Sequence, residues 1–368
     1  MESDRLSYMC ALSRVFAYKC SVGRRLLDSF GDVRSLFEAG RDGLSARLSG
    51  GREYIDRLLD PQLLEWAQRE VEWAARYGIA LLPIGDPRYP RRLAECGDAP
   101  LVLYCKGDAD LNASRVLAVV GTRKASWYGR EGCRRIVERL SDLEIKPLIV
   151  SGMALGIDGA AHEAALSSGL QTVGVLPCGL DEIYPRQHRG LACRILGEGA
   201  LVTDFPRRTS PVAFTFLRRN RIIAGMSDAV LLAESYRKGG GLITASLAES
   251  YNREVFALPG RLTDASFEGC NHLIARRDAI LAEDAEAIAL AMGWEMRKSI
   301  RGRRTLLQPG DPPKKRELLR LLESSSPLSA EDAARLTGLE AGEVTVLLLE
   351  LEMEGRAVAD GNKFFLSL

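Results

Sequence analysis

The stretch VVGTRKASWYG, residues 119–129, joins an apolar run to a turn that holds a glycine and two cations. A related pattern recurs at VSGMALGIDGAAHEAAL, residues 150–166, and at AESYRKGGGLITASLAES, residues 233–250. Each stretch takes the chain from a strand-like position through glycine into a helical pattern. Apolar strands separated by helices are typical of a parallel sheet that is covered on both faces. These stretches therefore predict a Rossmann-like, doubly wound α/β domain.

Six short apolar runs in the middle of the chain have the length and composition of buried strands. They lie at residues 116–120, 148–151, 172–176, 200–203, 229–233 and 254–257. Helical patterns fill the intervals, and parallel strands need such crossover connections. We therefore place the Rossmann-like domain at residues 80–290.

The flanking segments have other patterns. Residues 1–75 contain short amphipathic helices, with a break at Gly31 and a stop at Gly40, as in a small helix-hairpin-helix or sterile-alpha-motif-like bundle. Residues 81–100 form a connector rich in proline and glycine, and residues 291–313 form a basic linker that ends in proline. Residues 314–368 contain three amphipathic helices and two short strands around DGN, which is the order of a winged-helix domain.

The composition is that of an ordinary globular protein with an uneven distribution of charge. The chain has 368 residues, 46% of them hydrophobic, and a formal net charge of +1. Five arginines and no acid lie between Arg207 and Arg221, and five basic residues and no acid lie between Arg297 and Arg304. Binding of an anion is therefore expected to be local. Residues 1–70 carry eleven basic and eleven acidic side chains, which favours packing or protein contact there over DNA binding.

The sequence disfavours metal proteins and membrane proteins. Its eight cysteines form no CxxC pair, and His162, His188 and His272 are its three histidines, so we expect no metal and no cofactor. No apolar run approaches the length that spans a membrane, and Arg14 interrupts the N-terminal apolar stretch before a signal peptide forms. We expect a cytoplasmic protein with free thiols and no membrane contact.

Glycines and cations stand where phosphates bind in open parallel sheets, beyond the carboxyl ends of strands. The residues that we assign to phosphate binding are Gly121, Thr122, Arg123, Lys124, Gly152, Lys238, Gly239, Gly240 and Thr244. A single glycine after a strand is most often only a tight turn, but three such loops are harder to explain that way. The sequence has no GxxxxGK[ST], and no GxGxxG opens the first helix, so the loops suit phosphate without specifying a mononucleotide.

The stretch FLRRNRIIAG, residues 216–225, places arginines beside an aromatic ring. Single-stranded DNA needs cations or backbone amides for its phosphates and flat surfaces for its bases. We assign Phe216 to base stacking and Arg218, Arg219, Asn220 and Arg221 to DNA binding. Two structural interpretations stay open: Phe216 could be a core residue, and the arginines could form a solvated helix face with carboxylate partners. Arg219 and Arg221 cannot point the same way on a helix, so one of them could be structural.

Five motifs in order resemble those of the DNA-processing protein A (DprA, also called Smf) family. They are VVGTRKASWYG, VSGMALGIDGAAHEAAL, GVLPCGLDEIYP, FLRRNRIIAG and GGGLITASLAESYNREVFALPG, within residues 80–290. The resemblance implies a bacterial cytoplasmic protein that binds and protects single-stranded DNA and helps load the RecA recombinase in natural transformation. It also implies a homodimer formed through the Rossmann-like domain, and no enzymatic activity.

The resemblance extends to individual residues. Arg123 matches a phosphate-contacting arginine of the family. Phe216 matches its phenylalanine, and Arg219, Asn220 and Arg221 match its R-N-R core. Gly240 and Thr244 lie in its glycine-rich turn. The departures are Leu217 for a proline, Gly239 and Gly241 for serines, and His188 for an asparagine. These departures imply that affinity or sequence preference differs from that of the family.

The main alternative is an enzyme. Rossmann-like phosphoribohydrolases that act on nucleoside monophosphates carry a PGGxGT loop followed by a catalytic glutamate, and residues 238–250 are similar to that pattern. Lys238 replaces the proline, Ile243 stands where a glycine is needed, and Glu249 comes too late, so the pattern disfavours hydrolysis. A protein-binding scaffold would explain the sheet but not the arginines. No partner for nucleophilic or acid–base catalysis lies near His162 in the sequence, so we expect a structural histidine there.

The predicted winged-helix domain has the wrong charge for DNA. From Pro312 to Leu368 the sequence has seven Lys and Arg against ten Asp and Glu, a net charge of −3. Its third helix offers glutamates where a DNA-reading helix offers arginine, asparagine or glutamine. We therefore predict that this domain contacts protein, either a partner or a second copy of the chain.

Overall fold

A computed structural model describes residues 2–48, 51–296, 310–325 and 327–366 of the chain. The chain forms two compact units, Met1–Arg297 and Lys298–Leu368. Each unit is described on its own below.

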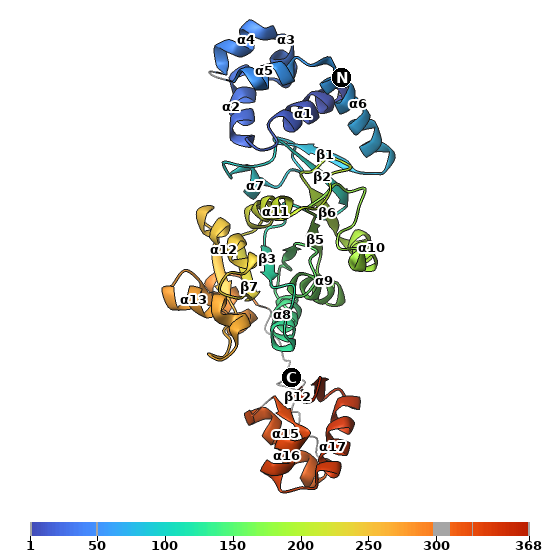
Figure 1. Ribbon diagram of the computed structural model, residues 1–368, viewed down its shortest axis with the longest axis vertical. Helices are drawn as coiled ribbons and strands as arrows, with labels where there is room; N and C mark the ends of the chain where they lie inside the picture. The colour runs from blue at the N-terminus through green and yellow to red at the C-terminus, as the bar shows by residue number, and fades with distance from the viewer. Residues whose placement is uncertain (1, 49–50, 297–309, 326, 367–368) are drawn as a thin grey trace. The chain divides into compact units, whose positions relative to one another are not determined.

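The larger unit is built around a nine-stranded sheet with the strand order β1-β2-β6-β5-β4-β3-β7-β8-β9 (Figure 1). The strands are β1 Ala80–Pro83, β2 Val102–Gly107, β3 Val116–Gly121, β4 Leu148–Ser151, β5 Thr172–Val175, β6 Ala200–Thr203, β7 Ala229–Glu234, β8 Glu254–Ala257 and β9 Ile280–Leu281. Neighbours from β6 to β9 in this order pair in parallel, whereas β1 and β2 pair antiparallel. The prediction of a doubly wound α/β domain is confirmed. All six predicted strands are present, and none differs from its predicted bounds by more than one residue.

Helices cover the parallel strands on both faces because these strands are apolar along their whole length. The helices are α7 Arg91–Ala94, α8 Trp127–Leu140, α9 Ile157–Ser167, α10 Arg189–Glu198, α11 Ala213–Met226, α12 Gly240–Ser250, α13 Glu268–Arg276 and α14 Ala285–Ala291, with 3-10 turns η1 Arg186–His188 and η2 Ala265–Phe267. On one side α9 packs against α8 and α10, and on the other α11 packs against α12 (Figure 1). Leu117, Ile149, Val173 and Leu231 are fully buried between these layers.

Six N-terminal helices pack on the antiparallel end of the sheet (Figure 1). They are α1 Glu2–Val15, α2 Cys20–Phe30, α3 Val33–Glu38, α4 Gly40–Arg47, α5 Arg52–Leu58 and α6 Pro61–Arg76. Gly31 ends α2 in the left-handed conformation, with φ of 71°, which a residue without a side chain adopts readily. We predicted that a helix ends at Gly40. Helix α3 ends two residues earlier, at Glu38, and the next helix, α4, begins at Gly40.

The segment that we interpreted as a connector, residues 81–100, carries structure of its own. Strand β1 reaches Pro83, and α7 follows at Arg91–Ala94. Strand β2 faces two cores, since Tyr104 packs among the N-terminal helices while Leu103 and Cys105 belong to the core of the main sheet. The sequence did not predict β1, because the segment is rich in proline and proline is disfavoured inside a sheet.

Residues 292–296, at the start of the predicted linker, pack on the larger unit. Trp294 is 9% exposed in the main core, and Met296 pairs with Leu143 in an isolated bridge. The basic stretch Arg297–Arg304 lies outside the described residues.

The smaller unit contains α15 Pro313–Ser325, β10 Leu328–Ser329, α16 Ala330–Thr337, α17 Ala341–Met353, β11 Ala357–Asp360 and β12 Lys363–Leu366. Its strands form a sheet in the order β10-β12-β11. Leu318, Leu322, Leu348 and Leu351 fill the core between the helices. The prediction of a winged-helix fold is confirmed, and Gly361, with φ of 65°, forms the predicted hairpin turn.

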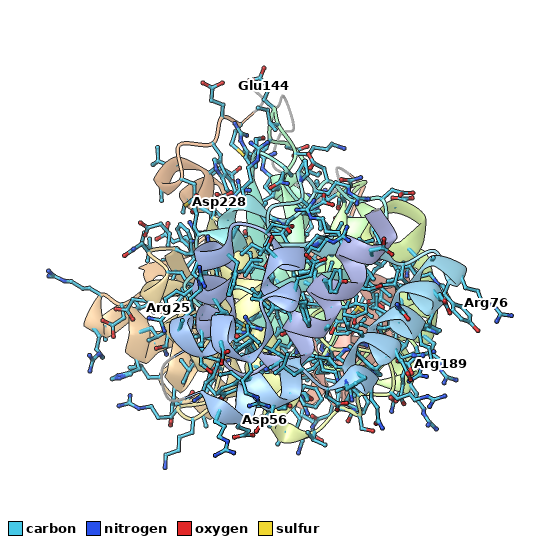
Figure 2. The ribbon with its side chains drawn as sticks, turned by 90° about the horizontal axis from the view of Figure 1, so that it is seen from above. Arg25, Asp56, Arg76, Glu144, Arg189 and Asp228 are labelled. Atoms are coloured by element: carbon cyan, nitrogen blue, oxygen red, sulfur yellow. The ribbon has the colours of Figure 1, made fainter. Side chains whose placement is uncertain are left out.

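Charged side chains project from the surface of the larger unit (Figure 2), and the described residues contain neither a disulfide nor a candidate metal site. In Figure 2 Glu144 lies at the top, Asp56 at the bottom, and Arg76 and Arg189 both on the right. All eight cysteines are free thiols. Within the described ranges, no group of three His, Cys, Asp or Glu side chains is placed to hold a metal, and no helix is both long and apolar enough to cross a membrane.

Candidate nucleic-acid interface

The loops that we assigned to phosphate binding meet at the carboxyl edge of the sheet. From β3 the chain adds β4, β5 and β6 on one side, and it then returns to add β7 and β8 on the other. Ligands of open α/β sheets bind at such a switch point, beyond the carboxyl ends of the two central strands. Here the turn after β3, the turn after β7 and the N-terminal end of α11 lie at this edge.

Arg123 and Phe216 form the most informative contact of this edge. The guanidinium carbon of Arg123 lies 4.5 Å from the centre of the Phe216 ring. Tyr184 meets the same ring edge-on, with ring centres 5.5 Å apart. Arg123 is exposed and Phe216 is half-buried. The structure thus brings an accessible cation and a partly accessible aromatic ring together from two distant parts of the sequence.

Arg219 points from α11 down onto the sheet and is 4% exposed. Its Nη1 donates to the carbonyl oxygens of Gly152 and Val175, at the ends of β4 and β5. Gly152 has to lack a side chain, because a Cβ there would lie 2.0 Å from Nη1 of Arg219. Burial lowers the pKa of Arg219 to about 10 against the attraction of Asp158, so the side chain is still a cation at neutral pH.

Arg218 and Arg221 share the carboxylate of Asp204, at the end of β6. Nη2 of Arg218 lies 2.9 Å and Nη2 of Arg221 lies 2.5 Å from Oδ2 of Asp204. Burial disfavours the charged form of Arg221, but the attraction of Asp204 and its other neighbours outweighs burial, so its pKa is raised. Arg218, Arg219 and Arg221 therefore all have protein partners, which hold α11 against the ends of β4, β5 and β6.

The predicted site residues divide by accessibility. Arg123, Lys124, Lys238 and Gly240 are exposed; Gly121, Thr122, Phe216, Arg218, Asn220 and Gly239 are half-buried; Gly152, Arg219, Arg221 and Thr244 are buried. Thr244 is 2% exposed on the inner side of α12. Two exposed neighbours that we did not assign, Tyr236 and Arg237, stand directly before Lys238. Their position in the sequence, beside the glycine-rich turn, could have identified Tyr236 and Arg237 as candidate site residues.

The N-terminus of α8, where many Rossmann-like proteins bind a nucleotide phosphate, already holds a carboxylate of this chain. Oε2 of Glu234 accepts from the backbone N and the Oγ of Ser126, at 2.9 and 3.0 Å. Glu234 is fully buried, and a Cβ on Gly129 would lie 2.0 Å from its Oε2. A nucleotide phosphate would have to displace this carboxylate, which agrees with the lack of a nucleotide fingerprint in the sequence.

The N-terminus of α12 is open by comparison. Gly239 is its N-cap and provides no side-chain cap. A Cβ on Gly240 would meet nothing within 4 Å, whereas a Cβ on Gly239 would lie 2.2 Å from Oγ of Ser235. The exposed backbone at Gly240 therefore allows an anion to approach the first turn of the helix.

His162 is fully buried in α9. Its Nδ1 lies 2.7 Å from the hydroxyl of Thr172, which in turn donates to the carbonyl of Ile149. Burial lowers the pKa of His162 to about 3. A neutral, hydrogen-bonded imidazole beneath the sheet agrees with the structural role that we expected for it.

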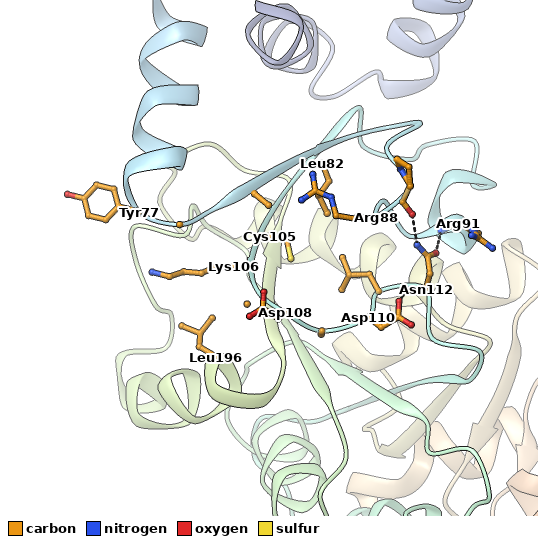
Figure 3. A pocket seen from close by; sticks show the side chains of 16 residues that line it. Tyr77, Leu82, Arg88, Arg91, Cys105, Lys106, Asp108, Asp110, Asn112 and Leu196 are labelled. Atoms are coloured by element: carbon orange, nitrogen blue, oxygen red, sulfur yellow. Dashed lines mark hydrogen bonds between the residues drawn. The ribbon is translucent and has the colours of Figure 1, made fainter. Parts of the chain in front are cut away.

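A hollow lies away from the carboxyl edge of the sheet, beside β2 (Figure 3). It has a volume of about 810 Å³, and its lining mixes Arg88, Arg91 and Lys106 with Asp108 and Asp110. Asn112 closes one side through hydrogen bonds to Arg91 and to backbone carbonyls (Figure 3). None of the predicted site residues lines this hollow.

The fold and the site define a Rossmann-like α/β protein that carries a winged-helix domain and a cationic, aromatic carboxyl edge. Residues 80–293 match the family described as DNA recombination-mediator protein A, and residues 303–362 match the DprA winged helix domain. The chain therefore belongs to the DNA recombination-mediator protein A family. This confirms the resemblance that the five motifs indicated.

Relatives show how much of the chain the family shares. Protein Smf of Escherichia coli is 39% identical over 232 residues, which are 62% of this chain and 61% of that protein, less than two thirds of its length. DNA processing protein A from Streptococcus pneumoniae, known from an X-ray structure, has a TM-score of 0.62 at 28% identity, over 79% of this chain and 99% of that one. DNA processing protein A from Helicobacter pylori, whose structure was studied for its single-stranded DNA binding mode, has a TM-score of 0.53 at 29% identity, over 59% of this chain and 97% of that one.

Proposed function

We propose that the carboxyl edge of the sheet binds single-stranded DNA. The observation that carries the proposal is the contact of exposed Arg123 with the ring of Phe216. An exposed cation stacked on a half-buried aromatic ring suits a strand whose bases are unpaired, because the phosphate and the base can be bound side by side. Lys124, Lys238 and the open backbone at Gly240 extend the same edge.

The family gives this proposal its biological setting. The description of the family concerns mediation of DNA recombination, and the Helicobacter pylori relative binds single-stranded DNA. On this basis we infer that the protein acts in the cytoplasm, protects incoming single strands and helps load the RecA recombinase on them in natural transformation. RecA is then its protein partner.

The buried arginines have a supporting part in this proposal. Arg219 fixes α11 to the ends of β4 and β5, and Arg218 and Arg221 fix it to Asp204. Together they keep Phe216 in contact with Arg123. They act as positioning residues that keep their partners when DNA binds.

A homodimer is also part of the proposal. Strand β9 ends the sheet with two residues, and both Ile280, 42% exposed, and Leu281, 36% exposed, are apolar. An apolar edge strand is a ready surface for pairing with a second copy. The Rossmann-like unit would then dimerise away from the edge that binds DNA.

The alternative of a nucleotide hydrolase has little support. Helix α12 spans Gly240–Ser250, and Glu249 lies at its C-terminal end. At 1.5 Å per residue, that places Glu249 about 13 Å along the axis from the glycine turn. A glutamate at that end is poorly placed to act on a nucleotide held at Gly240. We infer that the protein has no enzymatic activity, and incubation with nucleoside monophosphates should release no free base.

The decisive experiment separates base stacking from charge. Phe216→Ala should weaken binding of a labelled single strand by roughly 1–3 kcal/mol, with little change in the slope of log affinity against log salt. Phe30→Ala is a matched control, because Phe30 is also half-buried under an arginine, with Arg47 4.2 Å from its ring centre. An unaltered affinity in a folded Phe216→Ala protein would overturn the proposal.

A further inference from the structure

A second aromatic pair is exposed on the side of α11 that faces the N-terminal helices. Tyr18 is 72% exposed and Phe214 is 54% exposed. Their ring centres are 5.4 Å apart, and the ring planes are inclined by 58°. Two large aromatic side chains that stay this open to water form a surface that a ligand can cover with a gain in free energy.

Arg218 and Asp204 hold Tyr18 of this aromatic pair in place. Arg218 stacks on Tyr18, with its guanidinium carbon 4.8 Å from the ring centre, and Asp204 binds the same guanidinium. A second contact joins the N-terminal helices to the segment before α11: Glu70 of α6 is fully buried and forms an ion pair with Arg207 at 2.9 Å. These contacts fix the N-terminal helical region, and with it Tyr18, against α11.

The exposed face of α11 joins the two aromatic positions. At about 100° per residue, Phe216, Ala213, Leu217 and Phe214 follow one another around the helix. Ala213, Leu217 and Phe214 are exposed and Phe216 is half-buried, whereas Thr215 and Arg219 on the opposite face are buried. The open side of the helix therefore runs without interruption from the Arg123–Phe216 contact to Tyr18.

The surroundings favour a nucleic acid strand over a protein segment as the occupant. Arg208, between β6 and α11, is exposed, and the guanidinium group of Arg218 stacks on the ring of Tyr18. Lys19, next to Tyr18, is also exposed. Exposed aromatic rings with cations around them are the surface to which single strands bind by stacking their bases.

We propose that Tyr18 and Phe214 form a second base-stacking site for the same single strand that the Arg123–Phe216 pair binds. This proposal rests on the proposed function and deepens it. The strand then crosses the N-terminal half of α11, and the N-terminal helical region contributes directly to binding. Neither the near-neutral charge of that region nor any motif in it predicted this role.

The test measures the affinity of Tyr18→Ala, Phe214→Ala and the double variant for oligonucleotides that carry bases and for abasic oligonucleotides of the same length. For the base-carrying strand each single variant should lose roughly fivefold or more in affinity, with an unchanged salt slope. For the abasic strand the loss should vanish, since nothing remains to stack. Tyr77→Ala is the matched control, because Tyr77 is 53% exposed and packs on Trp73 at the end of α6.

The outcomes separate the two proposals. If the unchanged protein binds and Phe216→Ala weakens binding, but Tyr18→Ala and Phe214→Ala behave like Tyr77→Ala, the second site is refuted and the first stands. An equal loss on both kinds of strand would also refute stacking. If the unchanged protein binds no single strand, both proposals fail.

Discussion

Arg123 and Arg219 both lie at the carboxyl edge of the sheet, but their surroundings are opposite. Arg123 is exposed and rests on the ring of Phe216, whereas Arg219 is buried and donates to two backbone carbonyls. An exposed guanidinium can neutralise a phosphate without losing a hydrogen-bonded partner. A buried one must first break bonds that the fold needs. Substitution of the two residues should therefore alter different measurements.

Arg123→Ala should change the salt dependence of DNA binding. Loss of one phosphate contact flattens the slope of log affinity against log salt by about 0.7 for a single strand. The free energy of unfolding should stay the same, because the side chain is exposed. Arg76→Ala is the control, since Arg76 is also exposed and projects from the far end of α6 (Figure 2). Equal slopes for the Arg123→Ala and Arg76→Ala proteins would contradict the assignment.

Arg219→Met should instead destabilise the fold. The substitution leaves the carbonyls of Gly152 and Val175 without this donor and removes a cation that stabilises the charged form of buried Asp158. Removal of one member of such a buried group lowers the free energy of unfolding by roughly 3–5 kcal/mol, which urea denaturation measures. A protein of normal stability that has lost DNA affinity would show that Arg219 binds phosphate directly.

The sequence could identify these arginines but not their partners. The stretch FLRRNRIIAG predicts a cationic helix end, and Arg218, Arg219 and Arg221 do lie on one helix. Their burial depends on Asp204, Gly152 and Val175, which come from three other strand ends. Local pattern carries no information about which of these groups meet in space. For the same reason the contacts of Phe216 with Arg123 and of Phe214 with Tyr18 could not be predicted.

Helices α8 and α12 both start at the carboxyl edge, and they differ in what occupies their first turn. Glu234 accepts from Ser126 at the start of α8, whereas Gly239 leaves α12 without a side-chain cap. The positive end of a helix dipole attracts an anion only where no internal carboxylate has taken the place. We therefore expect DNA phosphate at α12 and not at α8.

Gly240→Ala tests this expectation at α12. A methyl group there meets no other atom within 4 Å, and alanine favours a helix more than glycine by up to about 1 kcal/mol. Thermal stability should stay equal or rise slightly, while affinity for a single strand falls by about 1 kcal/mol because the methyl group obstructs the backbone amides. Gly239→Ala should lower both, since its Cβ would lie 2.2 Å from Oγ of Ser235. Undiminished DNA affinity in Gly240→Ala would exclude the first turn of α12 from the site.

The elements that were predicted correctly are those whose pattern is local. Buried parallel strands such as Leu148–Ser151 and Ala200–Thr203 are continuous apolar runs, so their bounds could be read from the sequence. Strand β9 has only two residues, and β1 ends in a proline-rich segment. Pairing with a neighbouring strand, and not composition, defines these two strands.

The winged-helix unit adds little positive charge that could bind DNA. Lys315 lies 2.7 Å from Glu354, and Arg356 pairs with Asp311 at 2.5 Å. Lys314 is likewise 2.5 Å from Glu343. These pairs neutralise basic side chains in a segment whose net charge is already −3 by sequence. We therefore propose that this unit contacts protein.

Truncation tests that role. A chain that ends near Pro313 should keep its affinity for single strands, because the residues removed repel phosphate on average. A chain that ends near Met296 also lacks the basic stretch Arg297–Arg304, and it should lose at most a modest, salt-sensitive part of the affinity. A tenfold loss, about 1.4 kcal/mol, on removal of only the residues after Pro313 would contradict the charge argument, provided that folding and dimerisation are intact.

We propose that this molecule binds unpaired strands through phosphate and base contacts at one sheet edge. The most direct measurement is the affinity of the full chain for single-stranded and duplex DNA of equal length, at two salt concentrations and without metal or nucleotide. We expect tighter binding to the single strand at both salt concentrations, because Phe216 needs an unpaired base and Arg123 needs only a phosphate. Equal affinity for duplex, or binding that requires ATP, would contradict it.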